Sequence, residues 1–363
     1  MQKTEHHSNE FSLITGFLCV AVVYRHSAWA GGFNISSLGM PWEAVSQIMN
    51  LVLFSIVPIF FICWGYLSHK YLYEPRPAGI FLIHKLVQFY PVFFITSLVN
   101  FAYHPPLWDA HWLTIAGAFT GVYYTPGFTG GNIFLVVLFT VGLMALFKQL
   151  KVRGKALLGW SLLCLGITQF LPHESNLCYI RYFGFFTAFW LGVTLKELSF
   201  FERQPHPACR PIFWLTAGIG TATPLLNASG IHSLEIQYFP DSVEQLAFSL
   251  LLLTLAMDLI RRWKLHRSPN AMVTFLHRVG NQAYNHFMIH AYVIRLMIEV
   301  GSLLALPPPA TQLLIIAAAS PITVFCIARP YAAWASRHIS LPLLCRWGIP
   351  VETRSNEGPK VHV

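Results

Sequence analysis

The chain has 363 residues, of which 55% are hydrophobic and only 11% are charged, and its formal net charge is +9. Soluble domains carry about 25% charged residues, so this composition excludes a large soluble domain and predicts an all-α polytopic membrane protein. The positive charge does not indicate a nucleic-acid partner, because the basic residues are spread over short loops between apolar stretches, where they orient a membrane protein.

The sequence lacks the common signatures of several enzyme classes. It contains no nucleotide-binding loop of the GxxxxGK[ST] type, no HExxH zinc motif and no GxSxG nucleophile elbow. Its seven cysteines include no CxxC pair and no spacing typical of metal ligands, so we expect neither a disulfide framework nor a metal site. No internal repeat indicates a transporter built from two related halves.

Apolar stretches of suitable length predict about ten transmembrane helices within a single transmembrane domain at 11–330. The predicted spans are 11–30, 46–67, 83–103, 131–148, 156–171, 180–198, 211–229, 243–262, 281–304 and 311–330. We expect a polar cytoplasmic tail at 1–10 and a basic cytoplasmic tail at 331–363. The apolar stretch 111–124 is short and lies between proline-containing segments, so it is predicted to be re-entrant or interfacial.

Apart from the two terminal tails and Arg25, Arg181 and Arg295, lysine and arginine lie in or beside alternate loops. The basic loops hold Lys70, Arg76, Lys85, Lys148, Lys151, Arg153, Lys155, Lys196, Arg203, Arg210, Arg261, Arg262, Lys264, Arg267 and Arg278. The intervening connections contain neither residue; they are 31–45, 104–130, 172–179, 230–242 and 305–310. The positive-inside rule therefore predicts that both termini are cytoplasmic.

The first apolar stretch, 11–30, carries Arg25 and His26 near its predicted outer end. An ionisable pair late in a membrane helix is costly, so it should face protein or water rather than lipid. Two simpler interpretations stay open. Arg25 could extend to the lipid headgroups with His26 beside it, or the Ala-Trp-Ala sequence at 28–30 could be a signal-peptide cleavage site.

Further ionisable residues occur in or beside the later spans. Arg181 begins the sixth span from its outer side, and Arg295 lies in the body of the ninth. His286 and His290 precede Arg295 and share a helix face at i,i+4 spacing. Arg295 and Glu299 have the same spacing and could form a structural ion pair. Each side chain alone has a structural explanation, but together they predict a polar cavity that opens outward.

Three segments resemble the motifs of one membrane-protein family. Residues 57–67 read VPIFFICWGYL, residues 280–290 read GNQAYNHFMIH and residues 189–192 read FWLG. They are similar to the VPLFFxxSGYL, GxxSYxxYLIH and FxxG segments of the acyltransferase-3 family of integral-membrane acyltransferases, with Trp64 and Ala283 where serine is usual. Their order and spacing extend the resemblance over most of the chain. The family acylates surface glycans.

The resemblance implies that His26 occupies the position of the family's first-helix histidine. The arginine that normally stands eleven residues earlier is replaced by Thr15, which shares a helix face with His26 about 16 Å away. Of the basic pair that normally opens the third helix, Lys85 is kept and Gln88 replaces the other. The family's HLWFL segment appears as GNIFL at 131–135. The missing cations are candidates for binding the phosphates of acyl-coenzyme A or for stabilising charge during transfer.

The function implied by the resemblance is membrane O-acylation, the transfer of a group other than an amino-acyl group. Acyl-coenzyme A, expected to be acetyl-CoA, would be a co-substrate rather than a bound cofactor. The acceptor would be a glycan or glycolipid, such as a lipopolysaccharide or another surface polysaccharide. His26 is expected to be the base or transient acyl carrier, because acyl transfer needs a group that takes the hydroxyl proton. The side chains expected to bind donor or acceptor are Arg25, Lys85, Arg181, His286, His290 and Arg295.

Other functions stay open at this point. A catalytically inactive relative could bind or translocate a glycolipid through the same cavity, whereas an unrelated transporter is disfavoured by the lack of repeats. Lys70, Arg76 and Lys85 could serve membrane orientation alone. The expected location is the bacterial cytoplasmic (inner) membrane, with membrane lipids as partners and a homo-oligomer neither required nor excluded.

Overall fold

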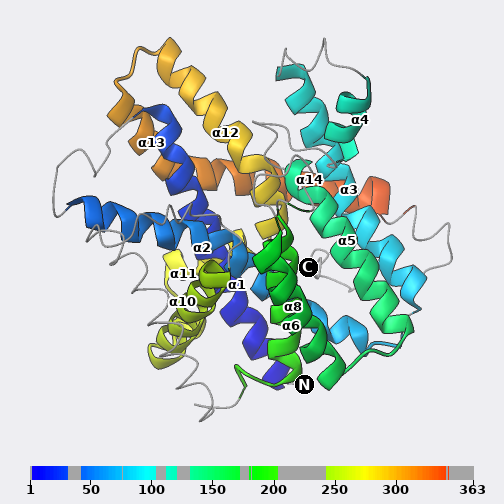
Figure 1. The fold of residues 1–363 in the computed structure, drawn as a ribbon. Helices are drawn as coiled ribbons and strands as arrows, with labels where there is room; N and C mark the ends of the chain where they lie inside the picture. The colour runs from blue at the N-terminus through cyan, green and yellow to red at the C-terminus, as the bar shows by residue number, and fades with distance from the viewer. Residues whose placement is uncertain are drawn as a thin grey trace.

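The computed structural model describes residues 2–31, 42–75, 77–103, 112–120, 131–171, 182–202 and 243–340, together with positions 180 and 342. The regular elements in these ranges are all helices, and none of the described residues forms a strand (Figure 1). The all-α class expected from the composition is therefore confirmed for the described part of the chain.

The α-helices follow one another with short helical turns at several ends. They are α1 (Gln2–Ser27), α2 (Trp42–Ser68), α3 (Ala78–Tyr103), α4 (Trp112–Thr120), α5 (Gly131–Gln149), α6 (Lys155–Phe170), α8 (Phe183–Glu197), α10 (Val243–Arg262), α11 (Ala271–Gly280), α12 (Ala283–Leu303), α13 (Pro308–Pro321) and α14 (Arg329–Ala335). The 3-10 turns are η1 (Ala28–Ala30), η3 (His69–Leu72) and η5 (Leu265–Arg267), and the π-helical segments are η6 (Ile322–Ala328) and η7 (Ser336–Ser340).

The helix boundaries differ from the predicted spans at three places. The first helix begins at Gln2, so the polar segment expected before residue 11 is continuous with it. The last predicted span extends as one helical run through α13, η6, α14 and η7 to Ser340. Helix α11 was not predicted at all, although its Asn270 cap accepts a hydrogen bond from the Met272 N–H at 2.8 Å. The predicted span 211–229 lies outside the described residues.

Two helical stretches are long and apolar enough to cross a membrane, Ala78–Val99 and Pro308–His338. Shorter apolar helices lie at Leu135–Gln149 and Lys155–Thr168. Two such stretches are weak evidence for membrane association of the described part of the chain. The short stretch predicted to be interfacial forms the nine-residue helix α4.

Helices α1 and α11 cross with their backbones in close contact at glycine residues. A Cβ atom at Gly16 would lie 1.9 Å from the Leu276 carbonyl oxygen, and one at Gly280 would lie 1.9 Å from the Ser12 carbonyl oxygen. Any larger residue would force the helices apart. Ser12 Oγ adds hydrogen bonds to the His277 carbonyl at 3.2 Å and to Asn281 Oδ1 at 3.0 Å.

Helices α2 and α8 cross in the same way elsewhere in the bundle. A Cβ atom at Gly65 would lie 2.0 Å from the Phe189 carbonyl oxygen, and one at Gly192 would lie 2.1 Å from the Ile62 carbonyl oxygen. The side chains around this crossing are aromatic, with the Trp64 and Phe189 ring centroids 4.6 Å apart. The segments 57–67 and 189–192 therefore meet each other, and their glycines have a packing role.

Candidate functional site

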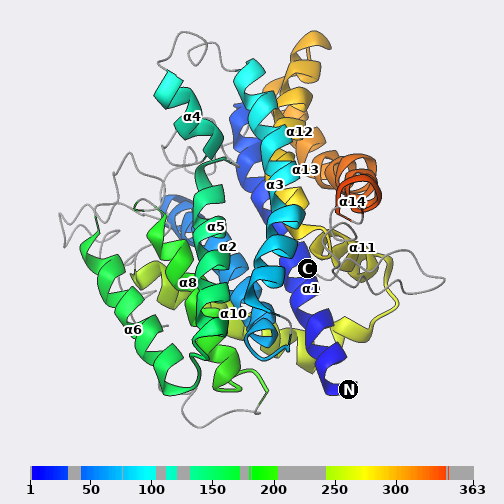
Figure 2. The ribbon, with the colours of Figure 1, turned by 90° about the vertical axis from the view of Figure 1, so that its right-hand side faces the viewer.

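His26 and His290 are brought together by the packing of α1 against α12. His26 lies in the last turn of α1, and Figure 2 shows α1 rising from the N-terminus to meet α12 and α13. His26 Nδ1 lies 3.0 Å from His290 Nε2, which is hydrogen-bonding distance. The two rings are nearly parallel, with an interplanar angle of 9° and centroids 5.1 Å apart.

The row of imidazoles continues one helical turn along α12 to His286. The rings of His286 and His290 are also parallel, at 5° with centroids 5.5 Å apart, and the two residues are 0% and 1% exposed. His290 Nδ1 lies 3.1 Å from the His286 carbonyl oxygen, and His286 Nε2 lies 3.3 Å from Ser320 Oγ. Among the described residues, His286 Nδ1 has no hydrogen-bond partner. His286 therefore lies behind the His26–His290 pair and touches it through its carbonyl.

The end of α1 is held in place beside α13. Ser27 Oγ donates to the Tyr24 carbonyl at 2.5 Å and accepts from Gln312 Nε2 at 3.5 Å. Ser27 is fully buried, while Arg25 and His26 are partly exposed. The last turn of α1 is therefore fixed on the side of α12 and α13, and this orients the His26 ring toward His290.

Lys85 lies in a buried aromatic setting rather than on an open surface. The residue is 1% exposed, and its ammonium lies 4.6 Å from the Tyr71 ring centroid and 5.6 Å from that of Phe89. Its Nζ donates to Gln88 Oε1 at 3.3 Å. Gln88, at the position where the acyltransferase-3 resemblance expects a second cation, thus accepts a hydrogen bond from Lys85. In this conformation the ammonium is closed off from solvent, and a phosphate could reach it only after neighbouring side chains, such as Tyr71, move.

The other predicted site residues differ in their placement relative to the histidines. Arg295 is partly buried on α12, five positions after His290, which places it about 140° further around the helix. Arg25 is next to His26 in the chain, and Arg181 lies outside the described residues. Thr15 is buried, and its hydroxyl donates to carbonyls of its own helix, of Phe11 at 2.9 Å and Ser12 at 3.2 Å.

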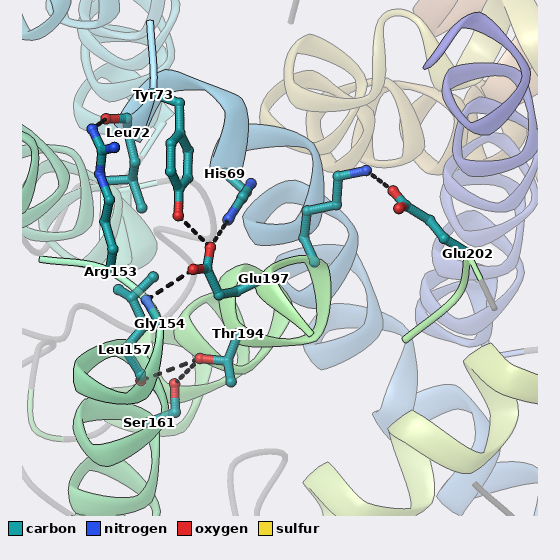
Figure 3. Close-up of polar contacts among 11 residues, drawn as sticks. His69, Leu72, Tyr73, Arg153, Gly154, Leu157, Ser161, Thr194, Glu197 and Glu202 are labelled. Atoms are coloured by element: carbon teal, nitrogen blue, oxygen red, sulfur yellow. Dashed lines mark hydrogen bonds and ion pairs between the residues drawn. The ribbon is translucent and has the colours of Figure 1, made fainter. Parts of the chain in front are cut away.

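A second polar cluster, around Glu197, was not predicted from the sequence. Glu197 Oε2 accepts from His69 Nε2 and from the Tyr73 hydroxyl, both at 2.5 Å, and Glu197 Oε1 accepts from the Gly154 N–H at 2.8 Å (Figure 3). Arg153 lies over the Tyr73 ring at 4.2 Å and donates to the Leu72 carbonyl at 3.3 Å. These residues come from three segments with no shared motif.

The Glu197 cluster holds the segment that covers Lys85. Its members His69 and Tyr73 flank Tyr71, whose ring lies against the Lys85 ammonium and whose carbonyl accepts from Lys148 Nζ at 2.5 Å. Burial lowers the pKa of His69, and the neighbouring Glu197 carboxylate opposes this shift. Lys70 is exposed on the same turn, and Arg76 lies outside the described residues. The hydrogen bonds of the cluster join η3, the α5–α6 turn and the end of α8.

Comparison with known proteins adds no relative. No protein-family model matches this chain, and neither the curated proteins nor the solved structures compared with it give a match. Within the described residues, no group of three or more His, Cys, Asp or Glu side chains is arranged to hold a metal ion. The acyltransferase-3 resemblance therefore depends on the sequence segments alone.

Proposed function

We propose that the protein is a polytopic membrane O-acyltransferase with about ten transmembrane helices and cytoplasmic termini. It would transfer an acyl group, expected to be acetyl, from acyl-coenzyme A to a hydroxyl of a surface or lipid-linked glycan. The contact between His26 and His290 carries this proposal, because a hydrogen bond to the Nδ1 side of an imidazole orients its Nε2 side for proton transfer. The expected location is the bacterial inner membrane.

The outer surface of the bundle supports a lipid environment. Large apolar side chains are exposed on many of the described helices, where water would make their exposure unfavourable and lipid would not. They include Phe17, Tyr90, Phe94, Leu98, Phe139, Leu146, Leu158, Leu162, Phe170, Leu255, Leu259, Leu296, Leu303, Leu313 and Trp334. Together with the two long apolar helices, this surface favours several membrane spans over one.

In the direct route, His26 acts as a general base. Its Nε2 takes the proton of the acceptor hydroxyl while the hydroxyl oxygen bonds to the thioester carbonyl carbon. The tetrahedral intermediate then breaks its carbon–sulfur bond. The leaving thiolate takes the proton from His26, so the products are the O-acyl glycan and coenzyme A, and the histidine returns to its starting form.

In the relay route, His26 carries the acyl group. Its Nε2 bonds to the thioester carbon and the coenzyme A thiolate leaves. The acceptor hydroxyl then bonds to the acyl carbon and the carbon–nitrogen bond to His26 breaks. The hydroxyl proton passes to Nε2 of His26 and from there to water, while the thiolate takes a proton from water on the donor side. This route suits a donor made in the cytoplasm and an acceptor outside, because donor and acceptor need not meet. Both routes use the same nitrogen of His26.

Lys85 is proposed to contact the phosphates of the donor from the cytoplasmic half. A lysine ammonium is a strong phosphate partner, and burying it without an anion is costly, so an arriving phosphate is favoured. The contact requires displacement of Tyr71, which covers the ammonium. The alternative role of Lys85 is orientation of the chain in the membrane.

A catalytically inactive relative that binds or translocates a glycolipid is the second candidate. It is favoured because this chain has uncharged residues, Thr15 and Gln88, at two positions where the acyltransferase-3 pattern has cations. The Thr15 hydroxyl is used by carbonyls of its own helix, and Gln88 binds Lys85. Neither side chain supplies the positive charge that phosphate binding or oxyanion stabilisation would use.

Transfer from labelled donor separates these candidates. The protein, purified in lipid nanodiscs, would be mixed with radiolabelled acetyl-CoA and a membrane glycolipid extract. The proposal expects release of coenzyme A and a glycan whose mass rises by one acetyl group, and it expects neither with His26→Ala. Glycolipid binding without coenzyme A release would favour the inactive relative.

A further inference from the structure

We propose that His290 is a positioning residue for His26. It fixes the tautomer in which the lone pair of His26 is on Nε2, and it shares the proton that Nε2 takes up. The tautomer follows from hydrogen bonds within the protein, whereas the role of His290 in acyl transfer depends on the proposed function. This assigns His290 a task other than the substrate binding expected from the sequence.

The His286 carbonyl sets the direction of the chain of hydrogen bonds. A carbonyl oxygen can only accept, so the His290 Nδ1 that lies 3.1 Å from it must carry the hydrogen. In neutral His290 the lone pair is then on Nε2. His26 Nδ1, at 3.0 Å from that nitrogen, must donate. Neutral His26 consequently has its hydrogen on Nδ1 and its lone pair on Nε2.

The same bond lets the pair hold one added proton. When Nε2 of His26 gains a proton, His26 has hydrogens on both nitrogens and the Nδ1 hydrogen points at His290 Nε2. That hydrogen can move across the 3.0 Å bond, which leaves His26 neutral and His290 positively charged. His290 Nδ1–H still donates to the His286 carbonyl, and a hydrogen bond from a charged donor is stronger than a neutral one. The charge is therefore spread over two rings.

The geometry assigns this role to His290 and not to His286. Both residues are buried on one face of α12, one turn apart. The His286 ring, however, makes its hydrogen bond to Ser320 Oγ on α13, while only its carbonyl contacts the pair. The His286 and His290 rings each lie parallel to a neighbouring imidazole, so a parallel arrangement does not distinguish them. What distinguishes His290 is the contact between its Nε2 and His26.

The tautomer can be measured without any transfer assay. In protein with ¹⁵N-labelled histidine, embedded in lipid bilayers, nitrogen chemical shifts separate a protonated ring nitrogen from one with a lone pair. The His26 and His290 signals are identified by their loss in His26→Gln and His290→Gln. We expect His26 to be protonated on Nδ1 only, with a nitrogen–nitrogen coupling to His290 Nε2. Protonation of neutral His26 on Nε2 only would overturn the inference.

Two substitutions of nearly equal size test the role in transfer. Gln places its amide oxygen near the position of a histidine Nε2, whereas Asn reaches only the position of Nδ1. We expect His290→Gln to keep transfer per folded molecule within about tenfold of the wild type, and His290→Asn to lose about 100-fold, the low end of a general base's contribution. Equal transfer by the two variants would mean that His290 only fills space.

The pH dependence gives a readout that packing alone would not move. In the wild type the added proton is shared by two rings and belongs to the pair as a unit, so the acidic limb of the pH–rate profile reports protonation of the pair. Gln cannot share the proton, so the acidic limb should move to lower pH in His290→Gln. An unchanged profile would contradict proton sharing. If the tautomer is found and the wild type transfers no acyl group, the pair stands and the proposed function fails. If acyl transfer occurs with the opposite tautomer, the proposed function stands and the role of His290 fails.

Discussion

The α1–α11 and α2–α8 crossings use the same contact between glycine and backbone but lead to different surroundings. At both, a Cβ atom would approach a carbonyl oxygen to between 1.9 and 2.1 Å. Around the α2–α8 crossing the neighbours are aromatic rings, such as Phe61 and Phe185 with centroids 5.4 Å apart. At the α1–α11 crossing they include the hydrogen-bonding groups of Ser12 and Asn281.

The difference lies in what each crossing positions. His26 follows Gly16 by ten residues (26 − 16), and His290 follows Gly280 by ten residues (290 − 280). Along α1 this is about 15 Å. The contact at one end thus sets the separation of the two histidines at the other. The α2–α8 crossing carries neither histidine of the pair and lies among aromatic side chains, so the same glycine contact lies beside the histidines in one place and away from them in the other.

The strongest test of the contrast is at His26 itself. We expect His26→Ala to lower transfer by about 10²- to 10⁴-fold, the usual contribution of a positioned base, while membrane insertion is kept. His26→Gln should behave alike, because an amide cannot take the proton. The measurement is acetylated glycan per unit of inserted protein. A cap at the helix end predicts the reverse: less protein, near-normal turnover per molecule and partial rescue by Gln.

Alanine at the two crossings should separate site from scaffold. Gly280→Ala and Gly192→Ala each force helices apart, and we expect each to reduce the free energy of unfolding by about 1–3 kcal/mol. Only Gly280→Ala should also reduce transfer per folded molecule, because it moves α11 and α12 relative to His26. Thermal unfolding in detergent and transfer assays measure the two effects.

Gly142→Ala on α5 is the matched control, since a Cβ atom there meets nothing within 4 Å. It should be neutral or slightly stabilising in a helix. A loss of transfer by Gly192→Ala as large as that by Gly280→Ala, at equal folded amount, would contradict the division between site and scaffold.

Substitution of Lys85, on α3, tests whether the proposed binding of the donor phosphates is independent of both helix crossings. Removal of one charge-assisted phosphate contact by Lys85→Ala should weaken donor binding by about tenfold without changing the rate at saturating donor. Tyr71→Leu should strengthen donor binding, because the ring covers the ammonium. Binding of a labelled acyl-coenzyme A analogue measures both. Unchanged affinity for the analogue in both variants would mean that Lys85 only helps to orient the chain in the membrane.

The smallest effect is expected at His69, on the scaffold side. Because burial lowers the pKa of His69 in the folded protein, the unfolded chain binds its proton more readily. The stability contributed by neutral His69 is present above the unfolded pKa of about 6.5 and is lost as pH falls through and below it. Thermal unfolding between about pH 8 and pH 5 should show a small loss that is absent in His69→Gln. Transfer should not follow this titration.

The positions of the long helices could be predicted because apolar length is a strong sequence signal. Each predicted span that falls within the described residues coincides with a helix. Helix α11 has only ten residues and follows a charged segment, so length could not reveal it. Its Asn270 cap, after Ser268 and Pro269, was the available signal.

The candidate site was predictable only in part. The sequence predicted that His26, His286 and His290 line one polar cavity. It could not predict the hydrogen bond between His26 and His290, because these residues are 264 positions apart in the chain. Lys85 was predicted beside a donor, and its burial under Tyr71 depends on a turn with no motif. The Glu197 cluster draws on three distant segments, so local patterns do not indicate it.

The long separation of His26 and His290 also sets an order for the protein's biogenesis. Non-local contacts form late, because the intervening chain must be placed first. The α2–α8 contact between Gly65 and Phe189 can form once roughly half the chain has been synthesised. The histidine pair cannot exist until α12 has left the ribosome and entered the bundle. A nascent or stalled chain would therefore hold a folded scaffold and a first histidine that still lacks its contact with His290, so the candidate site is complete only after the last helices have assembled.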